Sequence, residues 1–137
     1  MLAKAMVIAG GILTLGMALF HVTFPKLFDW KSDYAKIGAV RSRIPYTIHV
    51  ALLLLFVGVG LLSLVYVNEL SAPTGVGSGL MVVLALFWLW RTVWQVTYLR
   101  LPPGVKQSAW VVRHYVLTVV FALLALAYAY PVVASLR

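Results

Sequence analysis

Apolar residues in this chain fall into four long runs that are separated by shorter polar stretches. The runs cover residues 5–24, 45–67, 79–99 and 109–133. Each run holds about 20 residues or more, which is enough for a helix to cross a hydrocarbon core of about 30 Å. The pattern therefore predicts an all-α membrane protein, a four-helix transmembrane up-down bundle that forms a single domain over residues 1–137.

Turn-forming residues lie near the ends of the runs. Pro25 follows the first run and does not readily continue a helix. Pro45 suits the first turn of the second helix, with Ser42 as a nearby cap. Pro, Gly and Ser residues within 71–79 predict a flexible loop, and the Leu-Pro-Pro-Gly sequence at 101–104 predicts a tight turn. The third and fourth helices are therefore expected to be antiparallel neighbours.

The stretch between the first two runs has a different pattern. Apolar residues recur every three or four positions, and charged residues fill the positions between them; the apolar set is Leu27, Trp30, Tyr34, Ile37 and Val40. This spacing predicts a short amphipathic helix over about residues 26–40 that lies in the membrane interface. Trp30 and Tyr34 are expected to anchor it at headgroup level, and a docking surface for a partner is the alternative.

The composition agrees with a membrane protein and removes several classes of function. Of the 137 residues, 64% are hydrophobic, against roughly 45–50% in soluble domains. Cysteine is absent, which excludes disulfides, thiolate metal ligands and cysteine nucleophiles. The sequence contains no carboxylate pair, catalytic triad or phosphate-binding glycine loop that can be recognised. Whether the protein is an enzyme stays open.

The basic residues predict both a partner and an orientation. Eleven Lys and Arg residues against three acids give a formal net charge of +8. In a membrane protein this excess indicates cytoplasmic loops and anionic lipid, so the expected partners are the bilayer and other membrane-protein subunits rather than nucleic acid. Loop 25–44 holds five basic residues, and Arg100 and Lys106 lie in the third loop, whereas 68–78 has none. This asymmetry predicts a multi-pass protein of a bacterial-type inner (plasma) membrane with both termini outside.

Polar residues inside the runs gather near one end of each predicted helix. His21, His49, Gln95 and His114 lie within a few residues of the predicted cytoplasmic ends, which places them roughly 5–9 Å below the membrane boundary. Arg91 lies one turn deeper than Gln95. Such groups turn toward a bundle interior, because lipid offers no hydrogen bonds. The sequence therefore predicts one shared polar site in the cytoplasmic half of the bundle.

Helical spacing supports this convergence, because small or polar residues repeat on one face of each predicted helix. The four stripes are Gly10, Thr14, Met17 and His21; His49, Phe56, Gly60 and Ser63; Arg91, Gln95 and Tyr98; and Trp110, His114, Thr118 and Phe121. All four stripes are expected to face inward.

Arg91 is the most informative of the polar residues, because no acidic residue lies in any of the four runs. A charged side chain near the bilayer centre costs about 2.5–3.5 kcal/mol on insertion scales. Compensation is expected from backbone carbonyls, Gln95, water, neighbouring tryptophan faces, or a ligand such as a haem propionate, a quinone carbonyl or a lipid phosphate. The alternative is an arginine that snorkels to the membrane surface.

The histidines allow three interpretations. Two imidazoles at similar depth on different helices suit bis-His coordination of haem b, and His49 and His114 are the preferred pair. Alternatively, His21, His49 and His114 form a three-histidine site for Zn²⁺, Cu or Fe. The third interpretation is a structural hydrogen-bond network or a proton-handling role that needs no cofactor.

The expected function is that of a small integral inner-membrane protein. Its site, made of His49, His114, Arg91, Gln95 and His21, is expected to bind haem b, quinone or both in membrane redox chemistry. Two other classes remain open. One is a non-enzymatic accessory or assembly subunit of a membrane complex, and the other is a small ion- or lipid-handling channel component. No residue is identified as catalytic.

Overall fold

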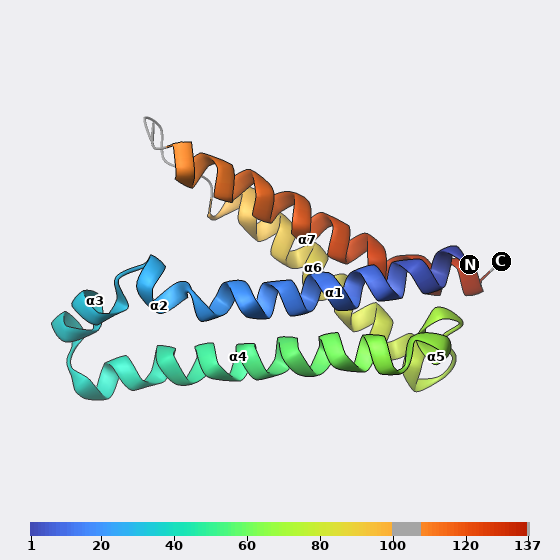
Figure 1. The fold of residues 1–137 in the computed structure, drawn as a ribbon, viewed down its shortest axis with the longest axis horizontal. Coiled ribbons are helices and arrows are strands. Elements are labelled where there is room, and N and C mark those ends of the chain that lie inside the picture. The colour runs from blue at the N-terminus through green and yellow to red at the C-terminus, as the bar shows by residue number, and fades with distance from the viewer. Residues whose placement is uncertain (100–107, 137) are drawn as a thin grey trace. The chain divides into compact units, whose positions relative to one another are not determined.

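The computed structural model describes residues 1–99 and 108–136, and within these ranges the chain is helical with no β-strand. The long helices are α1 (Leu2–Val22), α4 (Ala39–Val65), α6 (Val76–Thr97) and α7 (Ser108–Ser135), shown in Figure 1. Three short helices, α2 (Phe24–Leu27), α3 (Trp30–Ile37) and α5 (Val67–Ser71), lie between them. In the described part of the chain, the four long helices are apolar and long enough to cross a membrane. The predicted all-α membrane fold is confirmed.

The start of the second long helix differs from the prediction. Pro45 lies inside α4 rather than in its first turn. Ser42 is not a cap, because its amide N–H donates to the Gly38 carbonyl at 3.1 Å as part of the helix. The helical break falls instead at Gly38, whose φ of +85° is readily adopted only by glycine. Proline removes one backbone donor, but the turns on either side of Pro45 still form.

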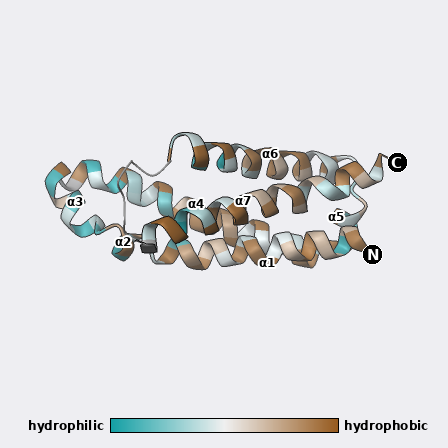
Figure 2. Ribbon diagram, turned by 90° about the horizontal axis from the view of Figure 1, so that it is seen from above, coloured by the Kyte–Doolittle hydropathy of each residue, from teal (hydrophilic) through white to brown (hydrophobic). Residues whose placement is uncertain are grey.

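The predicted interfacial helix is present in a shorter form. Asp29, with a φ of +46°, separates α2 from α3, so one continuous helix over 26–40 does not form. Figure 2 shows hydrophilic residues gathered on α3, whereas the long helices are mostly hydrophobic. On α3, Lys36 and Asp33 form an exposed ion pair at 3.0 Å. The turn predicted at 101–104 lies outside the described residues, as do Arg100 and Lys106.

The backbone of the chain falls into two compact units. The α1–α4 unit comprises Gly11–Val65, and the α6–α7 unit comprises Met1–Gly10 with Tyr66–Arg137. The membrane orientation of the chain stays a prediction.

In the α1–α4 unit, two glycines allow α1 and α4 to come very close. A Cβ built on Gly60 would lie 2.6 Å from the Leu15 Cγ and 3.1 Å from the Gly11 carbonyl oxygen. Only small residues permit such an approach, which is how membrane helices commonly pack. The predicted α4 stripe of His49, Phe56, Gly60 and Ser63 is buried throughout.

In the α6–α7 unit, α6 and α7 are antiparallel neighbours, as predicted. Trp88 stacks on Phe121 and Gln95 contacts His114, so positions rise along α6 as they fall along α7. The first turn of α1 and the last turn of α7 lie at the same end of this unit (Figure 1).

Candidate functional site

Three of the predicted site residues form one hydrogen-bond chain in the α6–α7 unit. The Arg91 Nη1–H donates to the Gln95 Oε1 at 3.3 Å, and the Gln95 Nε2–H donates to the His114 Nδ1 at 3.1 Å. Arg91 and Gln95 are one turn apart on α6, and His114 reaches them from α7. Gln95 and His114 meet from different helices, which is one part of the predicted convergence. The part that involves His49 stays a prediction, because His49 belongs to the other unit.

The hydrogen bonds from Arg91 to Gln95 and from Gln95 to His114 all run in one donor-to-acceptor direction. This direction fixes which ring nitrogen of His114 carries the proton. Guanidinium groups only donate, so the Gln95 carbonyl oxygen faces Arg91 and its amide nitrogen faces His114. The His114 Nδ1 must then accept, and in a neutral imidazole the proton lies on Nε2. The hydrogen-bond chain therefore begins at the charged guanidinium of Arg91 and ends at the Nε2–H of His114, which is itself a donor.

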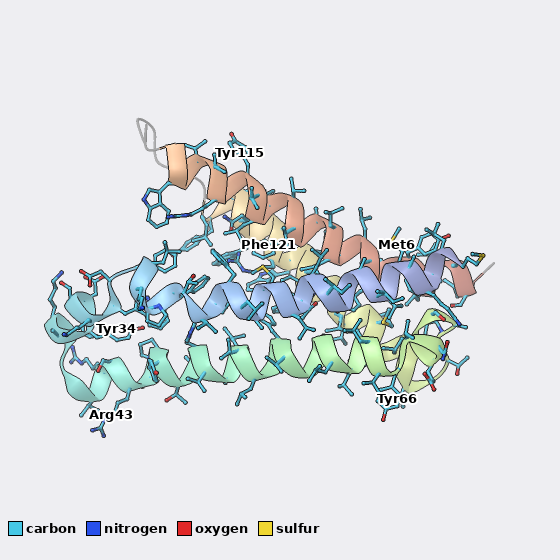
Figure 3. All side chains as sticks on the ribbon, viewed as in Figure 1. Met6, Tyr34, Arg43, Tyr66, Tyr115 and Phe121 are labelled. Carbon is cyan, nitrogen blue, oxygen red and sulfur yellow. The ribbon has the colours of Figure 1, made fainter. Side chains whose placement is uncertain are left out.

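An aromatic platform supports the charged end of the chain. The Arg91 Cζ lies 4.7 Å from the centroid of the Phe121 ring, and Phe121 stacks on Trp88 at 5.7 Å. Phe121 lies on the side of α7 toward α6, whereas Tyr115 points away (Figure 3). A cation over an aromatic face gains about 0.5–2 kcal/mol. Of the partners expected for Arg91, Gln95 is present, and the aromatic ring beneath the guanidinium is Phe121 of α7.

The charge of Arg91 has no acidic partner. Among the described residues the only ion pair is that between Lys36 and Asp33. Gln95 is 5% exposed, and both rings of the platform are almost fully buried. Arg91 itself is half-buried. The site therefore presents positive charge and N–H donors within apolar surroundings.

The other two predicted site residues lie together in the α1–α4 unit. The His21 and His49 rings have centroids 5.9 Å apart and planes within 19° of each other. The His21 Nδ1–H donates to the Met17 carbonyl at 2.9 Å, which leaves the ring lone pair on Nε2. His49 is 8% exposed.

Aromatic rings surround this imidazole pair. Phe24 stacks on His21 at 4.2 Å, and the edge contacts are Phe56 to His21 at 4.9 Å and Trp30 to His49 at 4.7 Å. The sequence suggested Trp30 only as a headgroup anchor and gave no role to Phe24. Both residues lie within about three helical turns of His21 in the sequence, in the segment that leads back toward His49. That proximity was the only sequence signal that they contact the histidines.

The predicted site residues are thus found as two groups, one in each unit. The His49–His114 haem pair and the three-histidine metal site each draw on both units, so both stay predictions. Within the described ranges, no three residues among His, Cys, Asp and Glu are grouped so that they could hold a metal ion.

Comparisons with known proteins do not assign a function. No protein-family model, curated protein or solved structure matches this chain. The four apolar helices identify a small multi-pass integral membrane protein in contact with a lipid bilayer.

Proposed function

We propose that this membrane protein binds a membrane-soluble quinone through Arg91, Gln95 and His114. The observation that carries the proposal is the directed hydrogen-bond chain, which leaves an N–H donor on the His114 Nε2. A quinone ring presents carbonyl acceptors and no donors, so its oxygen complements a site that offers donors. Specific polar groups within a mostly apolar lining are typical of small-molecule sites.

The charge of Arg91 strengthens this complementarity. Hydrogen bonds in series polarise one another, so a guanidinium at one end makes the terminal N–H a better donor. The low dielectric around the buried Gln95 increases the effect. The proposed site thus favours an electron-rich oxygen on an otherwise apolar molecule.

The same geometry favours quinone over haem at His114. A histidine that binds a metal usually donates its second ring N–H to a carboxylate or carbonyl. In His114 the second nitrogen accepts a hydrogen bond instead, so the outward nitrogen carries a proton. That arrangement supports donation to a carbonyl oxygen rather than axial ligation of iron.

The experiment uses the full chain in lipid nanodiscs and a short-chain benzoquinone labelled with ¹³C at its carbonyls. Infrared difference spectra should show the carbonyl stretch moving to lower frequency on binding. His114→Phe should weaken binding about tenfold, which corresponds to 1.4 kcal/mol, and should abolish the shift. The shift reports hydrogen bonding directly, so a general packing defect does not imitate it.

Arg113→Gln is the matched control, because Arg113 is the neighbouring α7 residue and lies over the Trp110 ring at 5.1 Å. It should bind the quinone as the wild type does. Wild-type protein that binds no quinone, or a carbonyl shift that survives His114→Phe, would contradict the proposal. The accessory-subunit interpretation, with a purely structural network, would then be preferred.

A further inference from the structure

The first turns of α4 carry an exposed apolar ridge. Val40, Ile44 and Ile48 follow one another at intervals of four residues, so they lie on one face of the helix. They are 75%, 63% and 56% exposed. His49, which is 8% exposed and stacks with the ring of His21 from α1, lies on the other side of the helix. The ridge therefore faces away from α1.

Two arginines flank this ridge. Arg41 follows Val40 by one residue and Arg43 precedes Ile44 by one, so helical spacing places the two arginines on either side of the ridge. Both arginines are exposed, and Figure 3 shows Arg43 extending away from α1. Neither forms an ion pair with a described residue, because the one ion pair in the described ranges lies within α3. The start of α4 therefore presents two guanidinium groups beside an apolar surface.

The length of the apolar span places these arginines at the depth of lipid headgroups. The span from Val40 to Val65 has 26 residues, which corresponds to about 39 Å of helix. A hydrocarbon core is about 30 Å thick, so one or two turns of α4 extend beyond it. A charged side chain inside the core is costly, so the turns that extend beyond it are those that carry Arg41 and Arg43.

The charges around the ridge favour an anionic ligand. Segment 25–44 holds five basic residues and two acids, and all seven are exposed. One lysine of the segment, Lys36, is neutralised by Asp33 at 3.0 Å. An excess of basic residues beside a membrane attracts anionic phospholipids. Arginine also suits the phosphate itself, because its planar group donates two parallel hydrogen bonds to phosphate oxygens.

We propose that the start of α4 binds an anionic phospholipid such as phosphatidylglycerol. Its phosphate lies between Arg41 and Arg43, and one acyl chain lies along the ridge of Val40, Ile44 and Ile48. The ridge continues into the apolar span of α4. It therefore suits an acyl chain and offers nothing to inorganic phosphate or to an acidic protein segment outside the membrane. No residue of the proposed quinone site takes part.

The test uses the full chain in phosphatidylcholine vesicles with a trace of spin-labelled phosphatidylglycerol or spin-labelled phosphatidylcholine. Electron spin resonance measures the fraction of each label that the protein immobilises. At low salt the wild type should prefer phosphatidylglycerol about threefold. In 1 M NaCl most of this preference should be lost, because the Debye length is then about 3 Å. The double variant Arg41→Gln with Arg43→Gln should show almost no preference at low salt.

Matched variants separate the site from the net charge. Lys4→Gln removes one charge from the exposed first turn of α1 and should keep the preference, whereas Arg43→Gln alone should lower it. The double variant Arg41→Lys with Arg43→Lys keeps both charges without the planar donors and should retain part of the preference. All these positions are exposed, so the melting temperatures should stay at the wild-type value.

The nature of the ligand is tested in the same vesicles. Inorganic phosphate, compared with chloride at equal ionic strength, should not displace the spin-labelled phosphatidylglycerol, because it makes no contact with the ridge. Displacement by phosphate would overturn the assignment to a lipid. Wild type without any preference would also overturn it and would favour an acidic protein segment as the partner. Equal losses in Lys4→Gln and Arg43→Gln would overturn the site. None of these outcomes depends on quinone binding.

Discussion

In the α6–α7 unit, the His114 imidazole receives a hydrogen bond at Nδ1, whereas in the α1–α4 unit the His21 Nδ1 gives one to a carbonyl. The same residue type is thereby prepared for opposite chemistry. In the neutral rings, the proton lies on Nε2 of His114 and on Nδ1 of His21. The partner of the inner nitrogen decides the role. Membrane depth or the number of histidines alone does not.

The units also differ in how their helices are held together. In the α1–α4 unit, Gly60 and Gly11 bring the two helices into close contact, whereas polar and aromatic side chains join α6 to α7. The two polar groups should therefore fail under different substitutions.

Gly60→Leu should disrupt the α1–α4 unit. An added Cβ already lies 2.6 Å from Leu15 and 3.1 Å from the Gly11 carbonyl oxygen. Overpacking of this kind typically costs about 1–3 kcal/mol, and the close backbone contact places this site at the upper end. The melting temperature in detergent should fall. Gly58→Leu is the control, because no atom lies within 4 Å of its added Cβ; equal destabilisation by both would refute the glycine-contact explanation.

Gln95→Leu should break the hydrogen-bond chain while the fold persists. Gln95 is 5% exposed and joins two partners, and leaving buried partners unsatisfied costs about 1–3 kcal/mol. The ¹⁵N spectrum of His114 should change from the Nε2–H tautomer to a mixture. The His21 resonances should keep their Nδ1–H pattern. A His114 tautomer that does not respond to Gln95→Leu would remove the basis of the comparison.

Arg91→Leu should have the smallest effect on stability. A buried charge without an acidic partner is often replaced by an apolar residue at no cost or with a gain, and the lost contact with Phe121 is worth about 0.5–2 kcal/mol. The melting temperature should stay near the wild-type value or rise, while quinone binding weakens several-fold. Phe121→Leu, which removes the platform and keeps the charge, is the companion variant. Severe unfolding of Arg91→Leu would indicate that the arginine is structural.

Hydropathy was enough to predict the four long helices, because a membrane requires long apolar segments whatever their partners. The Leu-Pro-Pro-Gly sequence at 101–104 predicted that α6 and α7 are neighbours, and depth with helical spacing predicted that Gln95 meets His114. The predicted start of α4 was wrong, because Pro45 was taken for a proline in the first turn of the helix. The helix begins after Gly38, whose positive φ breaks the preceding helix. Local sequence does not distinguish a proline that begins a helix from one that the helix continues through.

The state of each histidine was beyond sequence analysis. Spacing placed His21, His49 and His114 on inward faces, but it does not tell which rings meet or which nitrogen holds the proton. Those properties depend on atoms supplied by other turns and helices, such as the Met17 carbonyl and the Gln95 amide. The preference for His49 with His114 rested on depth alone, and depth says nothing about helix pairing. The platform under Arg91 likewise required the α6–α7 register.

Pro45 has a consequence for how α4 opens and closes. A proline inside a helix has no N–H, so the Arg41 carbonyl lacks the backbone donor that the fourth following residue would give. The turns from Ala39 to Ile44 are therefore coupled to the rest of α4 by one fewer hydrogen bond. Segments joined in this way tend to unfold separately. Amide protons before Pro45 should exchange with deuterium well before those after His49, which lie within the apolar run.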